Sequence, residues 1–348
     1  MKDITVKPDI TIRQAMKTLQ NTSGLCLLVV DKNNKLLGTI TDGDLRRSIL
    51  GGSLFTDDIS NSYNINPTTL TKGLFNSKEA KYQLRTKKLD LIPVVDKNNV
   101  VVEYVTWFTL GDEKMTVRLL DDVPVVIMAG GKGTRLEPFT KILPKPLVPI
   151  DGKPIIEHII ERFLDVGCNQ FYLTLNYKGQ ILKAYFEDLQ PFYKIEFLFE
   201  KEPLGTASSL SLVSGKLNAP FFVTNCDIII KADYAELYKF HQKGDYDITL
   251  VASTKEYIIP YGTCELNSRG HLSHINEKPT YDFLINTGLY VLNPDTLDLI
   301  PDNEFYHITH LIEAAKNKGK KVGVFPIDDE TWIDVGEWAE YKKVIERL

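Results

Sequence analysis

The chain has little that would suit a secreted, membrane-bound or nucleic-acid-binding protein. Its four cysteines are scattered and form no C-x-x-C pair, which argues against a disulfide framework or a zinc site and is typical of reduced thiols. No stretch approaches about 18 uncharged apolar residues, and the first residues lack the apolar core of a signal peptide. A net charge of −5 argues against a general nucleic-acid binder. These absences predict a cytoplasmic protein with no membrane or nucleic-acid partner.

With 348 residues, 43% of them hydrophobic, the chain is long enough for two domains that each bury a core. A polar segment with little periodicity, residues 111–122, separates two parts of different pattern. We expect one domain over residues 1–115, a linker over residues 116–122 and a second domain over residues 123–348. The linker is too short and too poor in glycine and serine for the domains to tumble freely.

The first part of the chain contains an internal repeat. The letters L-V-V-D-K-N-N at residues 28–34 return as P-V-V-D-K-N-N at residues 93–99. Both copies predict a strand, a turn rich in Asp and Asn, and a second strand. Apolar residues at helical spacing precede each copy, namely Ile12, Ala15, Met16 and Leu19 before the first, and Ala80, Leu84 and Leu89 before the second.

This repeat resembles a tandem pair of CBS motifs, which is an α/β domain, over residues 1–115. The first copy carries G-T-I-T-D-G-D-L-R at residues 38–46, the pattern of that family's adenosine site. The resemblance implies that Thr41 meets phosphate, that Asp44 holds the ribose hydroxyls and that an adenosine nucleotide is a ligand. Alternatively, residues 41–44 only cap the following helix. The second copy has Thr106 and Thr109 but no matching Asp, so at most one well-formed site is expected. The pair is also expected to drive assembly of a homodimer or higher homo-oligomer.

After residue 122, strand-like and helical patterns alternate. Apolar runs at residues 125–129, 171–176, 195–200 and 221–225 predict strands, and residues 154–166 predict a helix. Alternation of this kind is typical of a doubly wound, mainly parallel, Rossmann-like α/β sheet. Ligands of such sheets bind at the carboxyl ends of the strands.

A glycine-rich segment, G-G-K-G-T-R-L at residues 130–136, follows the first of these strands. Its three glycines allow the backbone to turn sharply and to point N–H groups at an anion. Arg135 adds a cation, and Lys145 in the following P-K-P segment offers a second. The spacing matches neither the dinucleotide-binding fingerprint nor the P-loop. The segment therefore predicts a polyphosphate site.

Two aspartates are candidates for holding a divalent cation. Asp227 follows the apolar strand at residues 221–225, and Asp334 lies between apolar residues further along the chain. An isolated Asp is more often a cap or a turn residue. Together the two predict a shared Mg²⁺, because buried carboxylates need a partner and this hard cation prefers oxygen ligands. The six histidines show no metal-ligand spacing and are assigned no catalytic role.

Further motifs follow in order along the second part. Residues 200–207, E-K-E-P-L-G-T-A, are expected to open a helix beside a flat nucleobase, with Gly205 allowing close backbone approach. Three short motifs offer groups suited to a sugar phosphate, namely Tyr261-Gly262, Glu277-Lys278-Pro279 and the segment that begins at Asn286. Taken singly, each of these motifs also fits a turn or a surface feature.

In this order, the motifs resemble those of the sugar-1-phosphate nucleotidylyltransferase family over about residues 123–348. The resemblance implies in-line attack of a sugar-1-phosphate on the α-phosphorus of a nucleoside triphosphate, with release of pyrophosphate. It implies catalysis by Arg135, Lys145 and Asp227. The other roles that it implies are nucleotide binding by Ala129, Gly130, Gly131, Gly133, Thr134, Arg135, Glu202, Gly205 and Thr206; sugar-phosphate binding by Lys145, Gly262, Glu277, Lys278 and Asn286; and Mg²⁺ binding by Asp227 and Asp334.

The E-P-L-G-T-A form of residues 202–207 resembles that of guanylyltransferases of the mannose-1-phosphate type. Its fusion to a CBS pair resembles the glucosamine-1-phosphate guanylyltransferases of legionaminic-acid biosynthesis. GTP and glucosamine-1-phosphate are therefore the favoured substrates. The alternatives are a mannose-, heptose- or other hexose-1-phosphate guanylyltransferase, or a catalytically inactive nucleotide-sensing module. The joint presence of Arg135, Lys145, Asp227 and Asp334 speaks against an inactive module.

Overall fold

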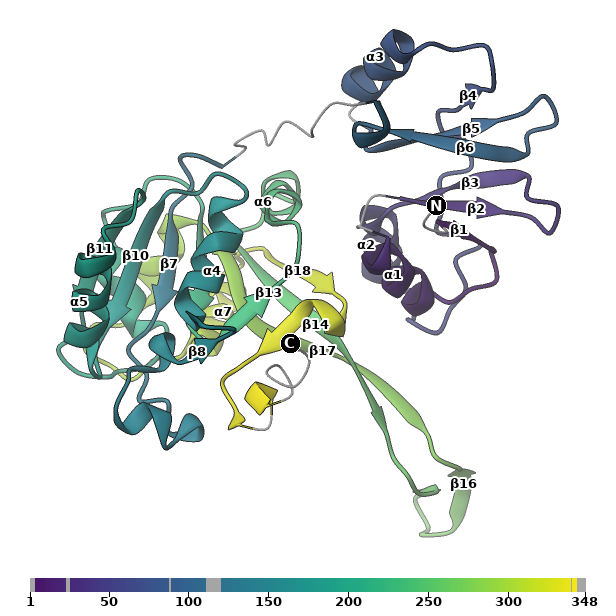
Figure 1. Cartoon of the computed structure of the whole chain (residues 1–348). Coiled ribbons are helices and arrows are strands. Elements are labelled where there is room, and N and C mark those ends of the chain that lie inside the picture. The colour runs from purple at the N-terminus through teal and green to yellow at the C-terminus, as the bar shows by residue number, and fades with distance from the viewer. Residues whose placement is uncertain (1–3, 23–25, 88, 111–119, 339, 343–348) are drawn as a thin grey trace. The chain divides into compact units, whose positions relative to one another are not determined.

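The computed structural model describes residues 4–22, 26–87, 89–110, 120–338 and 340–342. The chain divides into two compact units, residues 1–115 and 116–348 (Figure 1). Leu120 is buried, and its amide donates a hydrogen bond to the Val166 carbonyl at 3.2 Å. The end of the segment that was expected to be a linker is therefore part of the second unit. Residues 116–119 of that segment lie outside the described residues.

The first unit contains two copies of one arrangement, as the sequence repeat predicts. Each copy has a short strand, a helix and a β-hairpin that together form a three-stranded sheet with a helix packed on it. The elements of the first copy are β1 (Thr5–Val6), α1 (Ile12–Asn21), β2 (Leu27–Val30), β3 (Leu36–Ile40) and α2 (Asp42–Leu50). Those of the second are β4 (Leu70–Thr71), α3 (Ser77–Lys87), β5 (Leu91–Val95), β6 (Val101–Thr106) and a 3-10 turn at Phe108–Leu110.

The helices bury the apolar positions that the spacing predicts, with one exception. Ile12, Ala15, Met16 and Leu19 are buried in α1, and Ala80 and Leu84 are buried in α3. Leu89 lies beyond the end of α3 and is only partly buried against the same core, so it belongs to the loop before β5.

The two hairpin turns join the copies to each other. Asn34 and Asn99 occupy equivalent turn positions with positive φ angles. The Asn34 side chain donates to the Val101 carbonyl at 3.0 Å, and the Asn99 side chain donates to the Leu36 carbonyl at 2.9 Å. This reciprocal pairing makes the two copies one body with approximate two-fold symmetry.

A seven-stranded sheet forms the centre of the second unit, in the order β11-β10-β7-β12-β17-β14-β18. Neighbouring strands are parallel except where β17 pairs with β12 and β14. The expected doubly wound, mainly parallel sheet is thus confirmed. The strands are β7 (Val125–Met128), β10 (Gln170–Leu175), β11 (Lys194–Phe199), β12 (Phe221–Asn225), β14 (Ile248–Ile258), β17 (Thr280–Leu292) and β18 (Val322–Ile327).

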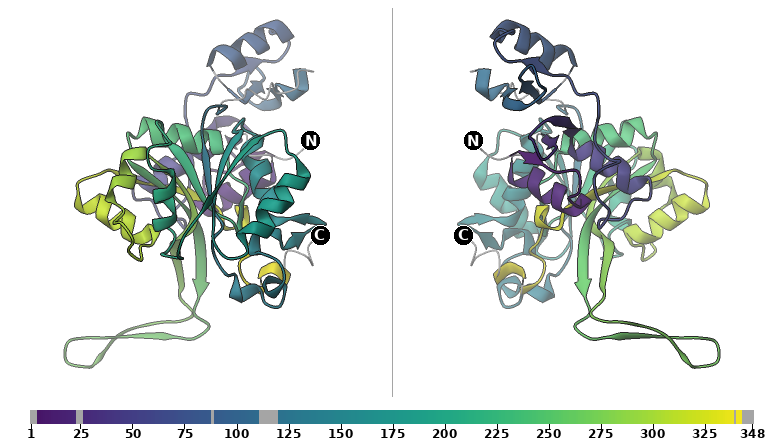
Figure 2. Two further views of the ribbon diagram at one scale, coloured as in Figure 1. Left: turned by 90° about the vertical axis from the view of Figure 1, so that its left-hand side faces the viewer. Right: turned by 90° about the vertical axis from the view of Figure 1, so that its right-hand side faces the viewer.

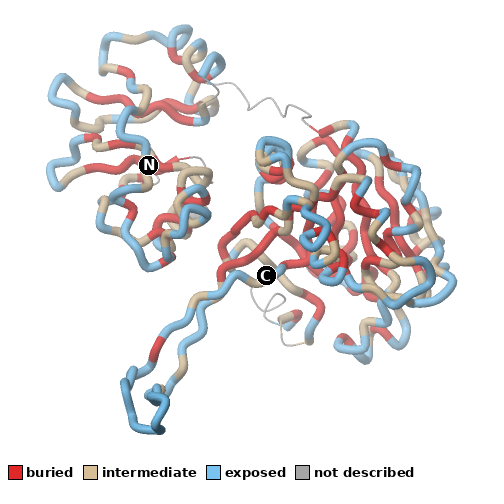
Figure 3. The backbone as a smooth tube through the Cα atoms, turned by 180° about the vertical axis from the view of Figure 1, so that it is seen from behind, coloured by how far each residue is buried: buried red, intermediate tan, exposed pale blue. Residues whose placement is uncertain are grey.

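Both faces of this sheet are covered. Along β7, Val125 and Ile127 belong to one buried apolar cluster, whereas Val126 and Met128 belong to another. Four helices and the irregular segments supply the rest of these two clusters, so the central strands are buried on both sides (Figure 3). The helices are α4 (Ile155–Leu164), α5 (Gly179–Leu189), α6 (Tyr234–Lys243) and α7 (Ile308–Asn317).

Three smaller ladders complete the second unit. Two of them, β8 (Pro149–Ile150) with β9 (Lys153–Pro154) and β13 (Ile228–Ile230) with β19 (Trp332–Asp334), lie against its body. In the third, β15 (Thr263–Leu266) pairs with β16 (Leu272–Asn276) at the end of a long arm. This arm, residues 255–284, is the outer part of the β14–β17 ribbon, and it leaves the body of the unit (Figure 2).

The four cysteines are free thiols. Cys26, Cys168 and Cys226 are buried, as expected for core thiols, but Cys264 is exposed because it lies on the arm. Among the described residues, no helix is both long and apolar enough to cross a membrane.

Candidate active site

The glycine-rich loop begins where β7 ends, at the carboxyl edge of the sheet. A Cβ atom at Gly130 would clash with the carboxylate of Glu200, and one at Gly133 would lie 3.0 Å from the side chains of Lys145 and Thr140. Gly133 also has φ near +66°, a conformation that other residues rarely adopt. The loop then enters a 3-10 turn at Thr134–Leu136. These glycines therefore let the loop pass close to two charged side chains.

A cavity of about 380 Å³ opens at this edge. The loop forms one wall and the ends of β11 and β12 form others, because these parallel strands finish at the same edge of the sheet as β7, with β12 next to it and β11 one strand further away. The lining residues are Met128, Gly130, Gly131, Gly133, Thr134, Arg135, Lys145, Glu200, Pro203, Gly205, Thr206, Ser209, Asn225, Cys226, Asp227, Phe305 and His307.

A cluster of three charged side chains lies at the end of β12. The Lys145 ammonium pairs with Asp227 Oδ2, and both side chains are about nine-tenths buried. Asp334 is brought beside them because β13 and β19 pair with Ile228 opposite Asp334, and because the Val335 amide donates to the Asp227 carbonyl at 2.9 Å. The two aspartates that the sequence singled out therefore meet.

Gly336 sits directly against this cluster. A Cβ atom at this position would clash with Asp227 Oδ2, and it would lie 2.9 Å from Asp334 Oδ1 and 3.1 Å from Lys145 Nζ. The Gly336 amide itself donates to Asp334 Oδ1 at 2.8 Å. Glycine here leaves room for the carboxylates and orients one of them.

Burial raises the pKa of Asp334, and the nearby charge of Asp227 raises that pKa further, against the opposing effect of the Gly336 amide. Lys145 pairs with Asp227 alone, so a second positive charge would stabilise the two neighbouring carboxylates. Mg²⁺ is commonly held by one or two carboxylates with waters and phosphate oxygens, so Asp227 and Asp334 fit that ion. No cluster of three or more His, Cys, Asp or Glu side chains placed to hold a metal ion occurs among the described residues.

Arg135 lines the cavity but pairs with Glu337, Nη1 to Oε1 at 2.8 Å. Both side chains are more than half exposed. An exposed pair of this kind contributes about 0–1 kcal/mol, so a polyphosphate can replace Glu337 as the partner of the guanidinium at little cost. The lining cations are therefore one buried lysine and one easily freed arginine.

The segment at residues 200–207 departs from the sequence prediction in three ways. Glu200, directly after β11, lines the cavity, whereas Glu202 does not and lines only a second hollow, which Glu200 also borders. Gly205 is required because an added Cβ would lie 2.6 Å from the Tyr306 carbonyl oxygen. The absence of a side chain therefore serves packing within the chain, and not only the approach of a ligand. The expected helix is a six-residue 3-10 turn, Ser208–Val213.

Thr206 and Ala129, both expected to bind nucleotide, have structural partners. The Thr206 hydroxyl accepts a hydrogen bond from the Ile308 amide at 3.0 Å while Thr206 still lines the cavity. Ala129 lies behind the loop, where its amide donates to the Thr174 carbonyl at 2.9 Å.

Glu200 is the residue that sequence reasoning missed. Burial raises the pKa of its carboxyl to about 7. It stands at the carboxyl end of a parallel strand, the same signal that identified Asp227 after β12. Phe305 and His307 also line the cavity, but their segment carries no pattern that would have pointed to them.

Most residues expected to bind the sugar phosphate lie on the arm and not at the cavity. Gly262, Glu277 and Lys278 are exposed on the arm, and none of them lines the cavity. The structure does bring two of them together, since a Cβ atom at Gly262 would lie 2.9 Å from Glu277 Oε2. Asn286, at the base of the arm, donates to the Tyr290 hydroxyl at 2.8 Å and accepts from the Gly288 amide. Of the five residues, only Lys145 reaches the cavity within this chain.

In the first unit, Thr41 and Asp44 form the capping box of α2. The Thr41 side chain accepts from the Asp44 amide at 3.3 Å, and Asp44 Oδ2 accepts from the Thr41 amide at 2.8 Å. Thr41 is thus the N-cap and Asp44 the third residue of the helix. Both also line a cavity of about 510 Å³ whose other walls come from the second copy, including Thr68 and Asp90. Capping and ligand binding are therefore compatible.

Comparison with known proteins agrees with this architecture. Residues 124–348 match the model of the nucleotidyl transferase family, and residues 1–51 match that of the CBS domain. The chain therefore belongs to the nucleotidyl transferase family.

Several relatives and solved structures are similar to the second unit. Mannose-1-phosphate guanyltransferases of Schizosaccharomyces pombe and Yarrowia lipolytica are 34% and 38% identical to the chain over 226 residues, which is 62% of this chain. The chain spans about three fifths of the length of these relatives, 61% in each case. The crystal structure of HddC from Yersinia pseudotuberculosis superposes with a TM-score of 0.52 and 28% identity, over 65% of this chain and 99% of HddC. Its complex with GMP-PN gives a TM-score of 0.51 and 26% identity.

We expect Gly336→Ala to lower nucleotidyl-transfer turnover by about 100-fold, because displacing catalytic groups by about 1 Å has effects of that size. The added methyl group has no space beside Asp227 and Asp334. Steady-state turnover and thermal unfolding measured together would show a loss of activity with the second unit still folded. Gly43→Ala in α2 is the control, since its Cβ would meet its nearest neighbour at an ordinary 3.5 Å. Near-normal turnover in Gly336→Ala would show that the cluster tolerates displacement.

Proposed function

We propose that the chain is a sugar-1-phosphate guanylyltransferase, which transfers GMP from GTP to a sugar-1-phosphate and releases pyrophosphate. The observation that carries this proposal is the meeting of Lys145, Asp227 and Asp334 at one end of a cavity walled by the glycine loop. The similarity to mannose-1-phosphate guanyltransferases, and to HddC solved with GMP-PN, supports the guanylyl group.

The triphosphate is proposed to lie along the glycine loop. Gly131 has open space where a side chain would be, and Gly130, Gly131, Gly133 and Thr134 line the cavity. Arg135 would leave Glu337 to bind the β- and γ-phosphates, where its planar guanidinium can contact two oxygens at once. This places the α-phosphate near Lys145 and Asp227.

Asp227 and Asp334 would hold Mg²⁺, which neutralises charge on the phosphates and helps to position them. Lys145 pairs with Asp227 in the structure, and its ammonium would shift to a phosphate oxygen when the substrates bind. The two carboxylates then keep a cation partner, so no buried negative charge is left unpaired.

The reaction is a direct displacement at phosphorus. An oxygen of the sugar-1-phosphate forms a bond to the α-phosphorus of GTP, the bond from that phosphorus to the bridging oxygen breaks, and pyrophosphate leaves with the electron pair. The attacking oxygen is already an anion, so no general base is required. Lys145 and Arg135 contribute by alignment and by offsetting negative charge.

Glu200 is proposed to read the guanine base. Guanine presents an N2 amino donor and an adjacent ring N–H, and an ionised carboxylate accepts two parallel hydrogen bonds from such a pair. Glu200 lies at the wall of the cavity formed by β11. Burial raises its pKa, so its ionised form is destabilised in the free protein and gains most from two donors.

The acceptor sugar is proposed from two lines of support. The fusion of a CBS pair to this unit favours glucosamine-1-phosphate, through the resemblance of the domain order. The names of the relatives favour mannose-1-phosphate instead. Both are hexose 1-phosphates, and the cavity would hold their phosphate in the same way, beside Lys145.

In the first unit, we propose one adenosine-nucleotide site, in the cavity that Thr41 and Asp44 share with the second copy. Asp44 would bind the ribose hydroxyls. Arg47, which also lines this cavity and pairs with Asp44, would turn to the phosphate. Thr109 replaces the carboxylate in the second copy and is used there to cap a turn, accepting from the Thr106 amide at 2.8 Å.

A grid of nucleoside triphosphates against sugar-1-phosphates, followed by pyrophosphate release, tests the reaction. We expect GTP to be preferred over UTP, CTP and dTTP, with glucosamine-1-phosphate or mannose-1-phosphate as the best acceptor. Turnover should require Mg²⁺ and should stop when EDTA removes it. A preference for dTTP or UTP would contradict the guanylyl assignment, and no turnover with any pair would favour an inactive nucleotide-binding module.

The pH dependence of GTP use tests Glu200. Because its pKa is near 7 and the ionised form is the one that binds guanine, kcat/KM for GTP should fall as the pH drops below about 7. Glu200→Gln should lower kcat/KM for GTP by about 10- to 100-fold and remove this acid limb, since charge-assisted hydrogen bonds contribute about 1.5–3 kcal/mol. Glu202→Gln is the matched control and should leave both unchanged. An equal loss in the two variants would contradict the role of Glu200.

Calorimetry of the full chain with AMP tests the site in the first unit. We expect about one AMP per chain, and Asp44→Asn should weaken binding about tenfold or more, because an amide loses the charge-assisted contact to the ribose. This variant keeps an oxygen that can accept the capping hydrogen bond of α2. Thr109→Ala is the control in the second copy. Two equivalent sites per chain, or undiminished binding in Asp44→Asn, would rule out the single-site assignment.

A further inference from the structure

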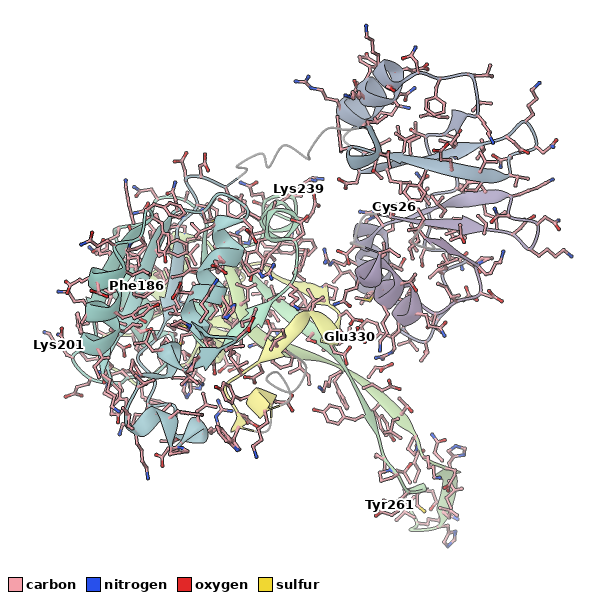
Figure 4. All side chains as sticks on the ribbon, viewed as in Figure 1. Cys26, Phe186, Lys201, Lys239, Tyr261 and Glu330 are labelled. Carbon is pink, nitrogen blue, oxygen red and sulfur yellow. The ribbon has the colours of Figure 1, made fainter. Side chains whose placement is uncertain are left out.

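The arm, residues 255–284, is the most exposed ordered part of the second unit. It continues the β14–β17 ladder beyond Thr254 and Thr287, the outermost buried residues of these two strands. Figure 3 shows most of the arm as exposed, and Figure 4 shows Tyr261 on its outer part, away from the body of the unit. The strand spacing of about 3.3 Å per residue gives the arm a reach on the order of 30 Å.

The two faces of the arm differ in character. In the antiparallel register Tyr257 lies opposite Tyr281, and Lys255 lies opposite Phe283, so these four side chains share one face. The rings of Tyr257 and Phe283 are in contact, with centroids 5.8 Å apart. Glu256 lies opposite Asp282 on the other face. One face therefore carries three aromatic rings and Lys255, whereas the other carries Glu256 and Asp282 together with Ile258 and Leu284.

The aromatic face is exposed in the isolated chain. Tyr257, Tyr281 and Phe283 are 50%, 42% and 51% exposed. Of the twenty large hydrophobic side chains that are exposed in the described parts of the chain, nine lie between residues 257 and 284. A two-stranded ribbon is at best marginally stable in water by itself, and an apolar patch of this kind marks a contact surface. The arm is therefore built to pack against something.

The outer part of the arm carries groups suited to a sugar phosphate. The Glu277 carboxylate lies against the backbone of Gly262, and Lys278 follows it. These groups could bind sugar hydroxyls and a phosphate. The cavity of the same chain is lined by residues between 128 and 227 and by Phe305 and His307. No described residue of the arm lines it. Within one chain, the candidate phosphate site and the Glu277–Lys278 pair therefore lie apart.

We propose that the arm binds a second copy of this chain, reciprocally, so that Glu277 and Lys278 of each copy complete the cavity of its partner. Apolar side chains near the cavity offer a docking surface for the aromatic face, since Phe305 in the cavity wall is 61% exposed and Ile142, three residues before Lys145, is 75% exposed. A two-fold dimer makes the exchange symmetric and leaves no open contact. The identity of the shared ligand rests on the proposed function.

Two mixed dimers test whether the arms are exchanged between the two chains. Each dimer is purified through a different tag on each chain. In the first, one chain carries Lys145→Ala and the other carries Glu277→Ala with Lys278→Ala. Exchange gives this dimer one intact site and about half of wild-type turnover, although both parent homodimers are inactive. In the second, one chain is wild type and the other carries all three substitutions. Exchange leaves this dimer with no intact site and no turnover.

An arm that folds back on its own cavity predicts the reverse result, with an inactive first dimer and a half-active second dimer. That pattern would overturn the proposal. Full turnover in the homodimer with Glu277→Ala and Lys278→Ala would also overturn it, because the arm would then not contribute to the site.

Two measurements do not depend on turnover and so separate this proposal from the proposed function. Light scattering should show that the wild type is at least dimeric. Tyr257→Ser with Tyr281→Ser and Phe283→Ser should abolish cross-linking between chains from the arm, whereas the opposite-face control, Glu256→Ser with Asp282→Ser, should keep it, and this readout holds even where the first unit keeps the chains paired. A benzophenone maleimide on Cys264, the one exposed thiol among the four, should cross-link to residues 130–145. In a mixture of ¹⁵N-labelled and unlabelled chains, exchange gives cross-links between the two isotopes. Cross-links within one isotope alone, or a monomeric wild type, would refute the exchange.

Discussion

The pairing of Lys145 with Asp227, beside Asp334, is the interaction on which the candidate active site depends. A parallel strand that ends in a carboxylate leaves that charge at the sheet edge, where neighbouring elements bury it. Burying an unpaired carboxylate costs several kcal/mol, so a cation must be held there. In this chain the cation comes from the segment after the glycine loop, and the second carboxylate comes from residues more than a hundred positions later.

Local geometry follows from this requirement. The β13–β19 ladder brings Asp334 to the cluster, and Gly336 leaves the space that two carboxylates and an ammonium need. Gly133 similarly lets the loop pass against the Lys145 stem. The glycines of the two motifs, G-G-x-G-T-R-L and the W-I-D-V-G segment at residues 332–336, thus both leave space for one cluster.

Much of this arrangement could be predicted from the sequence. Buried parallel strands are nearly continuous apolar runs, so the expected strands are confirmed, and their carboxyl ends locate the loop and Asp227. The aspartate pair was found because each lies in an apolar context that implies burial. Glu200 could have been found by the same rule, as the residue after β11, but the motif at residues 200–207 drew attention to Glu202 instead.

Other features could not be predicted because they depend on tertiary contacts. Gly205 faces the Tyr306 backbone, which lies about a hundred residues away in the sequence. The residues of the arm were grouped with the cavity because their chemistry suits a sugar phosphate, whereas the length of the β14–β17 ribbon separates them from it. Alternation of polar and apolar residues predicts a strand but does not say whether its apolar face packs inside the same chain.

Asp44 shows how one side chain can serve both the fold and a ligand. Its Oδ2 accepts from the Thr41 amide and hydroxyl and so fixes the start of α2. Its Oδ1 pairs with Arg47, whose side chain is 72% exposed. A ribose that bound this carboxylate would therefore compete with the exposed Arg47 pair, which contributes little, and not with the capping box. The start of α2 can stay intact while Oδ1 changes partner. Asp44 can therefore cap the helix through Oδ2 and bind a ligand through Oδ1, so the two interpretations of the T-D-G-D segment are compatible.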